Sequence, residues 1–239
     1  MNTRFSGQTI LVAGGTGGLG RAVSLAFLEE GAQVIVTYYL AEEFDALKGA
    51  VQSSGARLEG HQLNVSDEAA VRQLSEKVLA RHPRVDALVN AVGGYAGGAK
   101  LWEQDTNVFE HMLALNLRSG YALSRAFLPA MLKQARGAIV NVAAKAGLQP
   151  PAGAAAYAAS KAAALALMES LAAEVKGSGV RVNSILPSII DTQPNRKAMP
   201  DADFAKWPKP QDIARVILFL CSDEAKVIHG AAIPVYGES

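Results

Sequence analysis

The stretch that decides the fold is ILVAGGTGGLGRAV, residues 10–23. An apolar run typical of a buried strand leads into a glycine-rich turn, and a run with helical spacing follows it. Glycine permits a tight turn and a close approach of the backbone to a ligand, and a helix that begins after the turn points free N–H groups at it. The stretch therefore predicts a strand, a phosphate-binding turn and a helix, with glycines at Gly14, Gly15, Gly17, Gly18 and Gly20.

The rest of the chain repeats this alternation of strand and helix. Short runs rich in Val, Ile and Leu recur at 33–39, 57–65, 85–92, 137–144, 180–187 and 231–237. Longer runs with helical spacing lie between them, at 67–82, 107–134 and 154–179. Such alternation predicts an α/β fold, a Rossmann-type doubly wound parallel sheet with helices on both faces. Because no linker or repeat divides the 239 residues, we expect a single domain over 1–239.

One long segment lacks a clear period. Residues 187–209, PSIIDTQPNRKAMPDADFAKWPK, contain several prolines and mixed charge. Loops of this length inside a compact domain are usually functional or disordered. We therefore expect 187–209 to act as a lid over a substrate.

The composition excludes several classes of function. The 23 basic and 22 acidic residues nearly cancel, so no global field attracts nucleic acid or a membrane surface. A single cysteine, Cys221, excludes an internal disulfide framework. The histidines lack ligand spacing, which predicts no metal site. The first apolar run is too short for a signal-peptide core, which favours a cytoplasmic location.

Several motifs, taken together, resemble those of the short-chain dehydrogenase/reductase family over essentially the whole chain. The first is the spacing of Gly14, Gly18 and Gly20, and the second is LVNAVGG at 88–94, which contains Asn90. The others follow in the family's order, and they are Asn116, the pair Tyr157 and Lys161, Asn183, and PSIIDT at 187–192. The resemblance implies a single Rossmann-type domain that binds a nicotinamide cofactor.

The resemblance also implies which residues contact that cofactor. They are Gly14, Gly18, Leu19, Gly20, Thr37, Tyr38, Asn64, Val65, Asn90, Gly93, Tyr157, Lys161, Pro187, Ile190 and Thr192. An acid at the end of the second strand would select NAD(H), and an arginine would select NADP(H). The sequence has Thr37, Tyr38 and Tyr39 there, and Arg21 is the basic residue of the first helical turn. NADP(H) is favoured over NAD(H) because no acid repels its 2′-phosphate.

Tyr157 and Lys161 carry the predicted chemistry. Four residues make one helical turn, so both side chains project from one face. A tyrosine ordinarily has a pKa of about 10. We expect the lysine, together with a positively charged nicotinamide, to lower that pKa. The resemblance implies that Tyr157 donates the proton during reduction, that Lys161 also holds the nicotinamide ribose, and that Asn116 anchors a water.

The chain departs from the family pattern thirteen residues before Tyr157, where most members have a serine that polarises the substrate. This chain has Ala144 there, and Ala143 offers no hydroxyl either. Loss of one such donor to a developing oxyanion costs about 10²- to 10³-fold in rate. A simple ketone or alcohol would therefore be a poor substrate, unless another group replaces the serine.

Three stretches resemble one branch of the family, the quinonoid dihydropteridine reductases. They are AAKAGL at 143–148, GGYAGGAK at 93–100 and DTQPNRKAMPDADFAKW at 191–207. The resemblance implies reduction of a quinonoid dihydropterin or a similar conjugated acceptor. Hydride transfer to such a ring spreads charge over several nitrogens, so one proton donor suffices. Tyr95 and Trp102 are the aromatic residues expected to stack on the flat substrate.

Two alternative functions remain open at this point. The first is a general carbonyl or alcohol oxidoreductase in which another group replaces the missing serine. The second is a non-catalytic protein that senses the ratio of NADPH to NADP. Whatever its function, the chain is expected to be a homodimer or homotetramer. The helix over 154–176 carries small residues that permit close packing, and the resemblance implies that it and the helix over 107–134 form the subunit interface.

Overall fold

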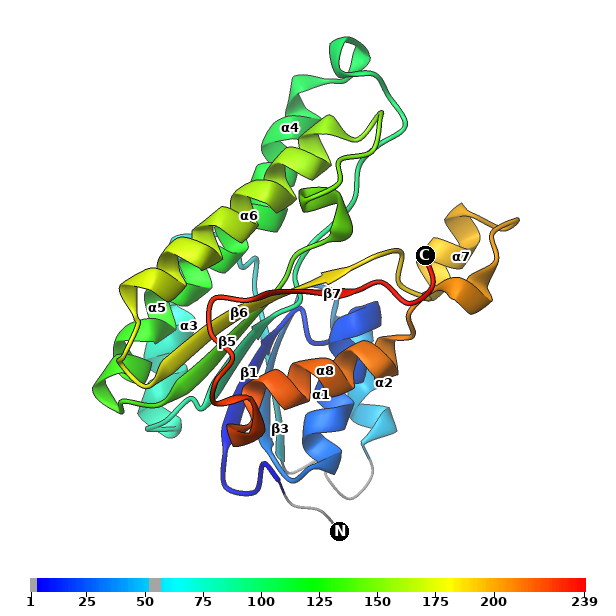
Figure 1. The fold of residues 1–239 in the computed structure, drawn as a ribbon. Coiled ribbons are helices and arrows are strands. Elements are labelled where there is room, and N and C mark those ends of the chain that lie inside the picture. The colour runs from blue at the N-terminus through cyan, green and yellow to red at the C-terminus, as the bar shows by residue number, and fades with distance from the viewer. Residues whose placement is uncertain (1–3, 52–56) are drawn as a thin grey trace.

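The computed structural model describes residues 4–51 and 57–239, so residues 1–3 and 52–56 of the predicted domain lie outside the described part. One seven-stranded sheet runs through the molecule in the order β3-β2-β1-β4-β5-β6-β7, and every neighbouring pair is parallel (Figure 1). The strands are β1 (Thr9–Ala13), β2 (Gln33–Tyr38), β3 (Leu58–Gln62), β4 (Ala87–Asn90), β5 (Gly137–Val142), β6 (Val180–Pro187) and β7 (Ala232–Val235).

The sheet forms because its central strands are apolar on both faces. In β1, Ile10 and Val12 enter one hydrophobic core, whereas Leu11 and Ala13 enter the other. All four side chains are fully buried. This is the alternation expected when helices cover both faces of a parallel sheet. The prediction of a Rossmann-type α/β fold is therefore confirmed.

The helices divide between the two faces (Figure 1). One core contains side chains of α1 (Gly18–Glu29), α2 (Ala41–Ala50) and α8 (Pro210–Cys221). The other contains side chains of α3 (Glu68–Arg81), α5 (Ser119–Lys133) and α6 (Ala155–Glu174). The sequence analysis had not identified α2, because only one of its side chains, that of Leu47, is buried and its apolar pattern is correspondingly weak.

The helix predicted over 107–134 is present, although it is not α-helical throughout. It consists of α4 (Thr106–Leu113), a turn of π-helix η3 (Ala114–Arg118), and α5. Turns of π-helix inside α-helices are frequent at functional sites because they redirect a side chain. The π turn contains the buried Asn116.

The segment 187–209 is also more regular than expected. It contains α7 (Gln193–Ala198) and the 3₁₀ turn η5 (Phe204–Lys206). Asp191 accepts hydrogen bonds from the guanidinium of Arg196, with Nη2 to Oδ2 at 2.8 Å. Arg196 in turn lies over the ring of Phe204, 4.8 Å from its centroid. The residues that carry the resemblance to pterin reductases in this segment thus make contacts that hold the segment itself together.

No helix in the described ranges is long and apolar enough to cross a membrane.

The close approach of α1 to β1 generates a stability prediction. A Cβ atom at Gly20 would lie 1.9 Å from the carbonyl oxygen of Gly14, whereas one at Gly49, in α2, would meet nothing within 4 Å. We expect Gly20→Ala to lower the free energy of unfolding by about 1–3 kcal/mol through overpacking. The control Gly49→Ala should raise it by about 0.5–1 kcal/mol. Urea unfolding measures both, and equal effects of the two substitutions would contradict the prediction.

Candidate active site

The glycine-rich turn lies at the C-terminal ends of β1 and β2. Gly14 has a φ of +69°, which favours glycine. Its N–H donates to Oγ1 of Thr37 at 3.0 Å, and the N–H of Gly15 donates to the Thr37 carbonyl at 3.1 Å. Thr37 was predicted to contact the cofactor, but its side chain is buried and its hydroxyl accepts from the turn. The structure thus places Thr37 as a support of the turn.

The N-terminus of α1 is open toward the same edge of the sheet. Its N-cap residue, Gly17, makes no side-chain cap, so no side chain of the cap residue takes up the first N–H groups. The side chain of Leu19 belongs to the core, which leaves its backbone to face the turn. A Cβ atom at Gly18 would lie 2.8 Å from Cγ2 of Thr192. The loop after β6 therefore contacts the turn.

The ends of β2 and β3 supply the next residues. The ring of Tyr38 stacks on that of Phe44 with centroids 4.6 Å apart, and Asn64 is exposed with Oδ1 accepting from the N–H of Ser66 at 2.9 Å. Val65 is buried in a core.

The sequence analysis missed an acid near these strand ends. The hydroxyl of Thr16, inside the turn, donates to Oε2 of Glu43 at 2.7 Å. Glu43 lies in the first turn of α2, so no spacing rule for the end of β2 identifies it.

Asn90 joins β4 to β5. Its Nδ2 donates to Oδ1 of Asn141 at 2.9 Å, and its Oδ1 accepts from the N–H of Val92 at 3.2 Å. Gly93 follows in a position where a Cβ atom would lie 2.9 Å from both Oδ1 of Asn116 and Nζ of Lys161. The predicted residues Asn90, Gly93, Asn116 and Lys161 therefore meet at one place, although Asn90 is committed to contacts within the protein.

Both the nitrogen and the oxygen of the Asn116 amide are hydrogen-bonded within the protein. Its Nδ2 donates to the Gly94 carbonyl at 3.1 Å and to Oγ of Ser160 at 3.0 Å, and its Oδ1 accepts from the Gly94 N–H at 3.0 Å. The amide thus ties the loop after β4 to α6, directly before Lys161. Ser160 is a second residue that the sequence analysis missed, since a serine next to the lysine carries no signal by itself.

Lys161 is buried beside Tyr157 on α6. Its ammonium donates to the carbonyl of Val142 at 3.0 Å, and only 5% of the residue is exposed. Burial disfavours the charged form and lowers the pKa of Lys161 to about 8. The lysine is therefore mostly protonated at neutral pH, at an energetic cost to the fold.

Within the chain itself the pKa of Tyr157 is raised. Desolvation by burial raises it to about 12, and the neighbouring Tyr95 adds to this shift. The ammonium of Lys161 donates to the Val142 carbonyl and is not among the causes of this shift. A lowered tyrosine pKa is therefore not a property of the chain by itself, and the phenol is protonated at neutral pH.

Three of the predicted substrate residues lie in different surroundings. Ala144 is 6% exposed, at the end of β5, and neither it nor the adjacent Ala143 presents a polar group. The ring of Tyr95 packs edge-on against that of Tyr157, with centroids 5.0 Å apart and planes at 74°. Trp102 is 79% exposed, and its ring lies under Nζ of Lys100 at 5.4 Å. Tyr95 thus lies beside Tyr157 of the predicted catalytic pair, whereas Trp102 is exposed to solvent.

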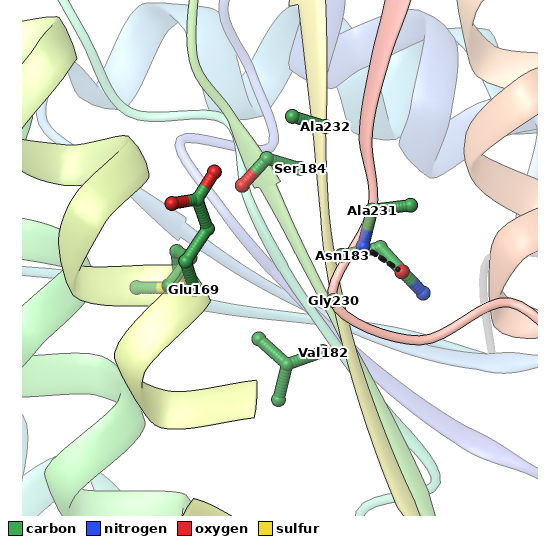
Figure 2. A pocket seen from close by; sticks show the side chains of 8 residues that line it. Glu169, Val182, Asn183, Ser184, Gly230, Ala231 and Ala232 are labelled. Atoms are coloured by element: carbon green, nitrogen blue, oxygen red, sulfur yellow. Dashed lines mark hydrogen bonds between the residues drawn. The ribbon is translucent and has the colours of Figure 1, made fainter. Parts of the chain in front are cut away.

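Other candidate positions carry no site. Within residues 4–51 and 57–239, no group of three or more His, Cys, Asp or Glu side chains could hold a metal ion. The thiol of Cys221 is buried, and burial raises its pKa to about 12. Figure 2 shows a hollow between α6 and the strands β6 and β7, with Glu169 and Ser184 facing each other, but it is too small for a water molecule.

The fold and the edge of the sheet define a class of protein. The strand order reverses between β1 and β4, and the open N-terminus of α1 points to the crevice at that place. In open α/β sheets this is where dinucleotides bind, with the pyrophosphate at the helix N-terminus. The chain is therefore an α/β protein of the dinucleotide-binding class. It belongs to the short chain dehydrogenase family, whose pattern matches residues 8–203.

Characterised relatives agree with this assignment. The 3-oxoacyl-[acyl-carrier-protein] reductase FabG of Thermotoga maritima is 31% identical, and the match covers 98% of this chain and 98% of the relative. The meso-2,3-butanediol dehydrogenase of Serratia marcescens is also 31% identical, over 98% of this chain and 95% of the relative. The chain is thus similar to oxidoreductases along its whole length.

Solved structures give the same result. The structure of ElxO with NADP bound superimposes with a TM-score of 0.90 at 27% identity, covering 96% of this chain and 97% of the other. A short chain dehydrogenase of Shigella flexneri complexed with NADP gives a TM-score of 0.90 at 26% identity, covering 98% and 99%. These findings establish an oxidoreductase of the short-chain type. The resemblance to pterin reductases rests on the sequence motifs alone.

The burial of Lys161 generates a prediction about stability and pH. Because its folded pKa is below its ordinary value, the charged lysine costs stability below pH 8, and this cost disappears as pH rises toward 10.5. We expect Lys161→Met to raise the free energy of unfolding by about 1–3 kcal/mol at pH 7 and by much less near pH 10.5. Denaturant unfolding across this pH range measures the difference between the variant and the original chain.

The control for this prediction is Lys176→Met, which removes an exposed lysine just after α6. It should change the free energy of unfolding by less than about 0.5 kcal/mol at every pH. A destabilised Lys161→Met variant at pH 7 would contradict the inference that the buried charge is costly.

Proposed function

We propose that this chain is an NADP(H)-dependent reductase in which Tyr157 donates a proton to a conjugated acceptor of the quinonoid dihydropterin type. The observation that carries the proposal is that the site has the proton donor and its neighbours but lacks the second hydroxyl. Tyr157, Lys161 and Asn116 come together, while the positions of the substrate-polarising hydroxyl are the buried Ala143 and Ala144.

The residues that would hold the cofactor fit a dinucleotide. The turn from Gly14 to Gly20 and the uncapped start of α1 suit a pyrophosphate, and Gly93 lets the backbone lie close to Asn116 and Lys161. When bound, the cofactor supplies the hydride. NADP(H) is favoured because the end of β2 has no acid and because the related structures described above were solved with NADP.

The two shifted pKa values suit a reductase. A phenol with a pKa of about 12 stays protonated at neutral pH, so Tyr157 is in the donor state before the reaction. As the proton leaves, a negative charge develops on the phenol oxygen. The ammonium of Lys161, one helical turn away and shielded from water, stabilises that charge.

The absence of a serine hydroxyl at Ala144 favours some hydride acceptors over others. A ketone gathers negative charge on one oxygen as it is reduced, and that oxygen needs more than one donor. A conjugated ring with several nitrogens distributes the charge, so the proton from Tyr157 suffices. The ring of Tyr95, 67% exposed and packed against Tyr157, offers a flat aromatic wall to such a substrate.

A carbonyl or alcohol oxidoreductase is the second candidate, and two observations favour it. The relatives described above are named for a 3-oxoacyl group and for a butanediol. In addition, Tyr95 carries a hydroxyl next to Tyr157 that would replace the serine as the second donor. In this second function Tyr95→Phe would lose activity, whereas the aromatic wall of the first function would be retained.

The lid and the assembly are part of the proposal. Residues 187–209 would close over the substrate, because the loop begins at the end of β6 and contacts the glycine-rich turn through Thr192. Two copies would pair through the helices over 107–134 and 154–176. Phe109, Tyr121 and Leu132 leave apolar surface exposed on α4 and α5 that such a pairing would cover.

The proposed reaction is tested with purified protein, NADPH and NADH, against quinonoid dihydropterin and a panel of ketones. We expect turnover of the pterin with NADPH, and a loss of about 10²- to 10⁴-fold in kcat for Tyr157→Phe because the proton donor is removed. Ala144→Ser should leave pterin turnover within a few-fold. The matched control, Tyr121→Phe, alters an exposed tyrosine in the first turn of α5 and should have no effect.

Ketone reduction that Ala144→Ser raises and Tyr95→Phe lowers would instead establish the carbonyl oxidoreductase. Tight binding of the cofactor without turnover of any acceptor would support the non-catalytic sensor and would refute both enzymatic functions.

The proposed assembly is tested by sedimentation equilibrium at micromolar concentration. We expect a dimer or tetramer, and we expect Tyr121→Glu to shift it toward the monomer because a charge would enter the apolar interface. The control Glu76→Gln changes a charge on α3, away from the proposed interface, and should leave the mass unchanged. A monomeric original chain would refute the proposed pairing.

A further inference from the structure

A hydrogen bond connects the glycine-rich turn to the first turn of α2. The hydroxyl of Thr16 donates to Oε2 of Glu43 at 2.7 Å, and Thr16 is only 6% exposed. The carboxylate of Glu43 is half-buried. This hydrogen bond holds the Glu43 carboxylate against the glycine-rich turn, although 27 residues separate the two side chains in the sequence.

The Thr16 and Glu43 pair is close to the part of the fold where the adenosine ribose of a dinucleotide binds. β2 is the neighbour of β1 in the sheet, and α2 follows β2 after a short connection, so Glu43 lies between the turn and the end of β2. In a dinucleotide-binding fold, the 2′ position of the adenosine ribose lies at the end of this strand. An acid there accepts from the ribose 2′-hydroxyl and repels a 2′-phosphate. In this chain the acid is supplied by the helix, since the strand ends in Thr37 and Tyr38.

The adjacent Glu42 strengthens this effect, because it places a second carboxylate in the first turn of α2. Asp45, two residues after Glu43, is paired with Lys48 at 2.7 Å. In the described part of the chain no lysine or arginine forms an ion pair with Glu43. Arg21, in the first turn of α1, is exposed and is the basic residue nearest in sequence to the turn. An incoming 2′-phosphate would therefore meet a carboxylate that no ion pair neutralises.

We infer that Glu43 is a specificity-determining residue that opposes the 2′-phosphate and keeps the preference for NADP(H) over NAD(H) small. The inference rests on the cofactor binding of the proposed function. Thr16 holds the carboxylate in place, and the positive charge of Arg21 attracts the 2′-phosphate that Glu43 repels. Glu43→Gln removes the charge while an amide oxygen can still accept from Thr16.

The test measures binding, with no turnover involved. Isothermal titration gives the dissociation constants of 2′,5′-ADP and 5′-AMP, which differ only in the 2′-phosphate, and of NADP⁺ and NAD⁺. We expect Glu43→Gln to tighten 2′,5′-ADP about tenfold relative to 5′-AMP, because one unit of like charge is removed at close range. NADP⁺ should tighten relative to NAD⁺ by a similar factor. The matched control, Glu42→Gln, should change either ratio by less than about twofold.

The outcomes separate the inference from the proposed function. If both ratios stay unchanged in Glu43→Gln while the cofactors still bind, the inference fails and the proposed function stands. A variant that loses thermal stability with unchanged ratios would assign Glu43 to the start of α2 alone and would also overturn the inference. If the original chain binds none of the four probes, the proposed function itself fails.

Discussion

The close contact between the backbone of Gly20 and that of Gly14 determines where α1 lies relative to the glycine-rich turn. The Gly20 backbone lies so near the carbonyl of Gly14 that no side chain fits between them. This contact seats the first turn of α1 against the end of β1, and it aims the uncapped N–H groups of α1 at the crevice where the strand order reverses. The phosphate-binding turn therefore depends on two glycines, since a Cβ at Gly20 would meet the Gly14 carbonyl and a Cβ at Gly14 would meet Val92 in the loop after β4.

A second constraint is the burial of a charge. The ammonium of Lys161 is shielded from water and held by the Val142 carbonyl, so its pKa falls to about 8 and the fold bears the cost of its charge at neutral pH. The adjacent Tyr157 is also desolvated, and its pKa rises to about 12. Both shifts have the same cause, because burial disfavours the charged form of each group. In the proposed reductase, the same exclusion of water lets the Lys161 cation stabilise the tyrosinate formed when the proton leaves.

The segment 187–209 shows that a motif can resemble that of another enzyme and yet be accounted for by contacts within the segment. Arg196 contacts both Asp191 and Phe204, and all three belong to the stretch that resembles the pterin reductases. These contacts hold the segment together. In the proposed function, the choice between a pterin and a carbonyl compound therefore rests on Ala144 and Tyr95.

The sequence alone determined the features that depend on near neighbours. Strand, turn and helix at 10–23, and the shared face of Tyr157 and Lys161, follow from local spacing, which has the same geometry in any fold. Tertiary structure decided what depends on burial and on distant segments. It placed a π turn around Asn116 within the long helix, raised the pKa of Tyr157 by burial, and brought Glu43 to the glycine-rich turn. The physical reason is that desolvation and contacts between segments far apart in sequence arise only once the chain has packed.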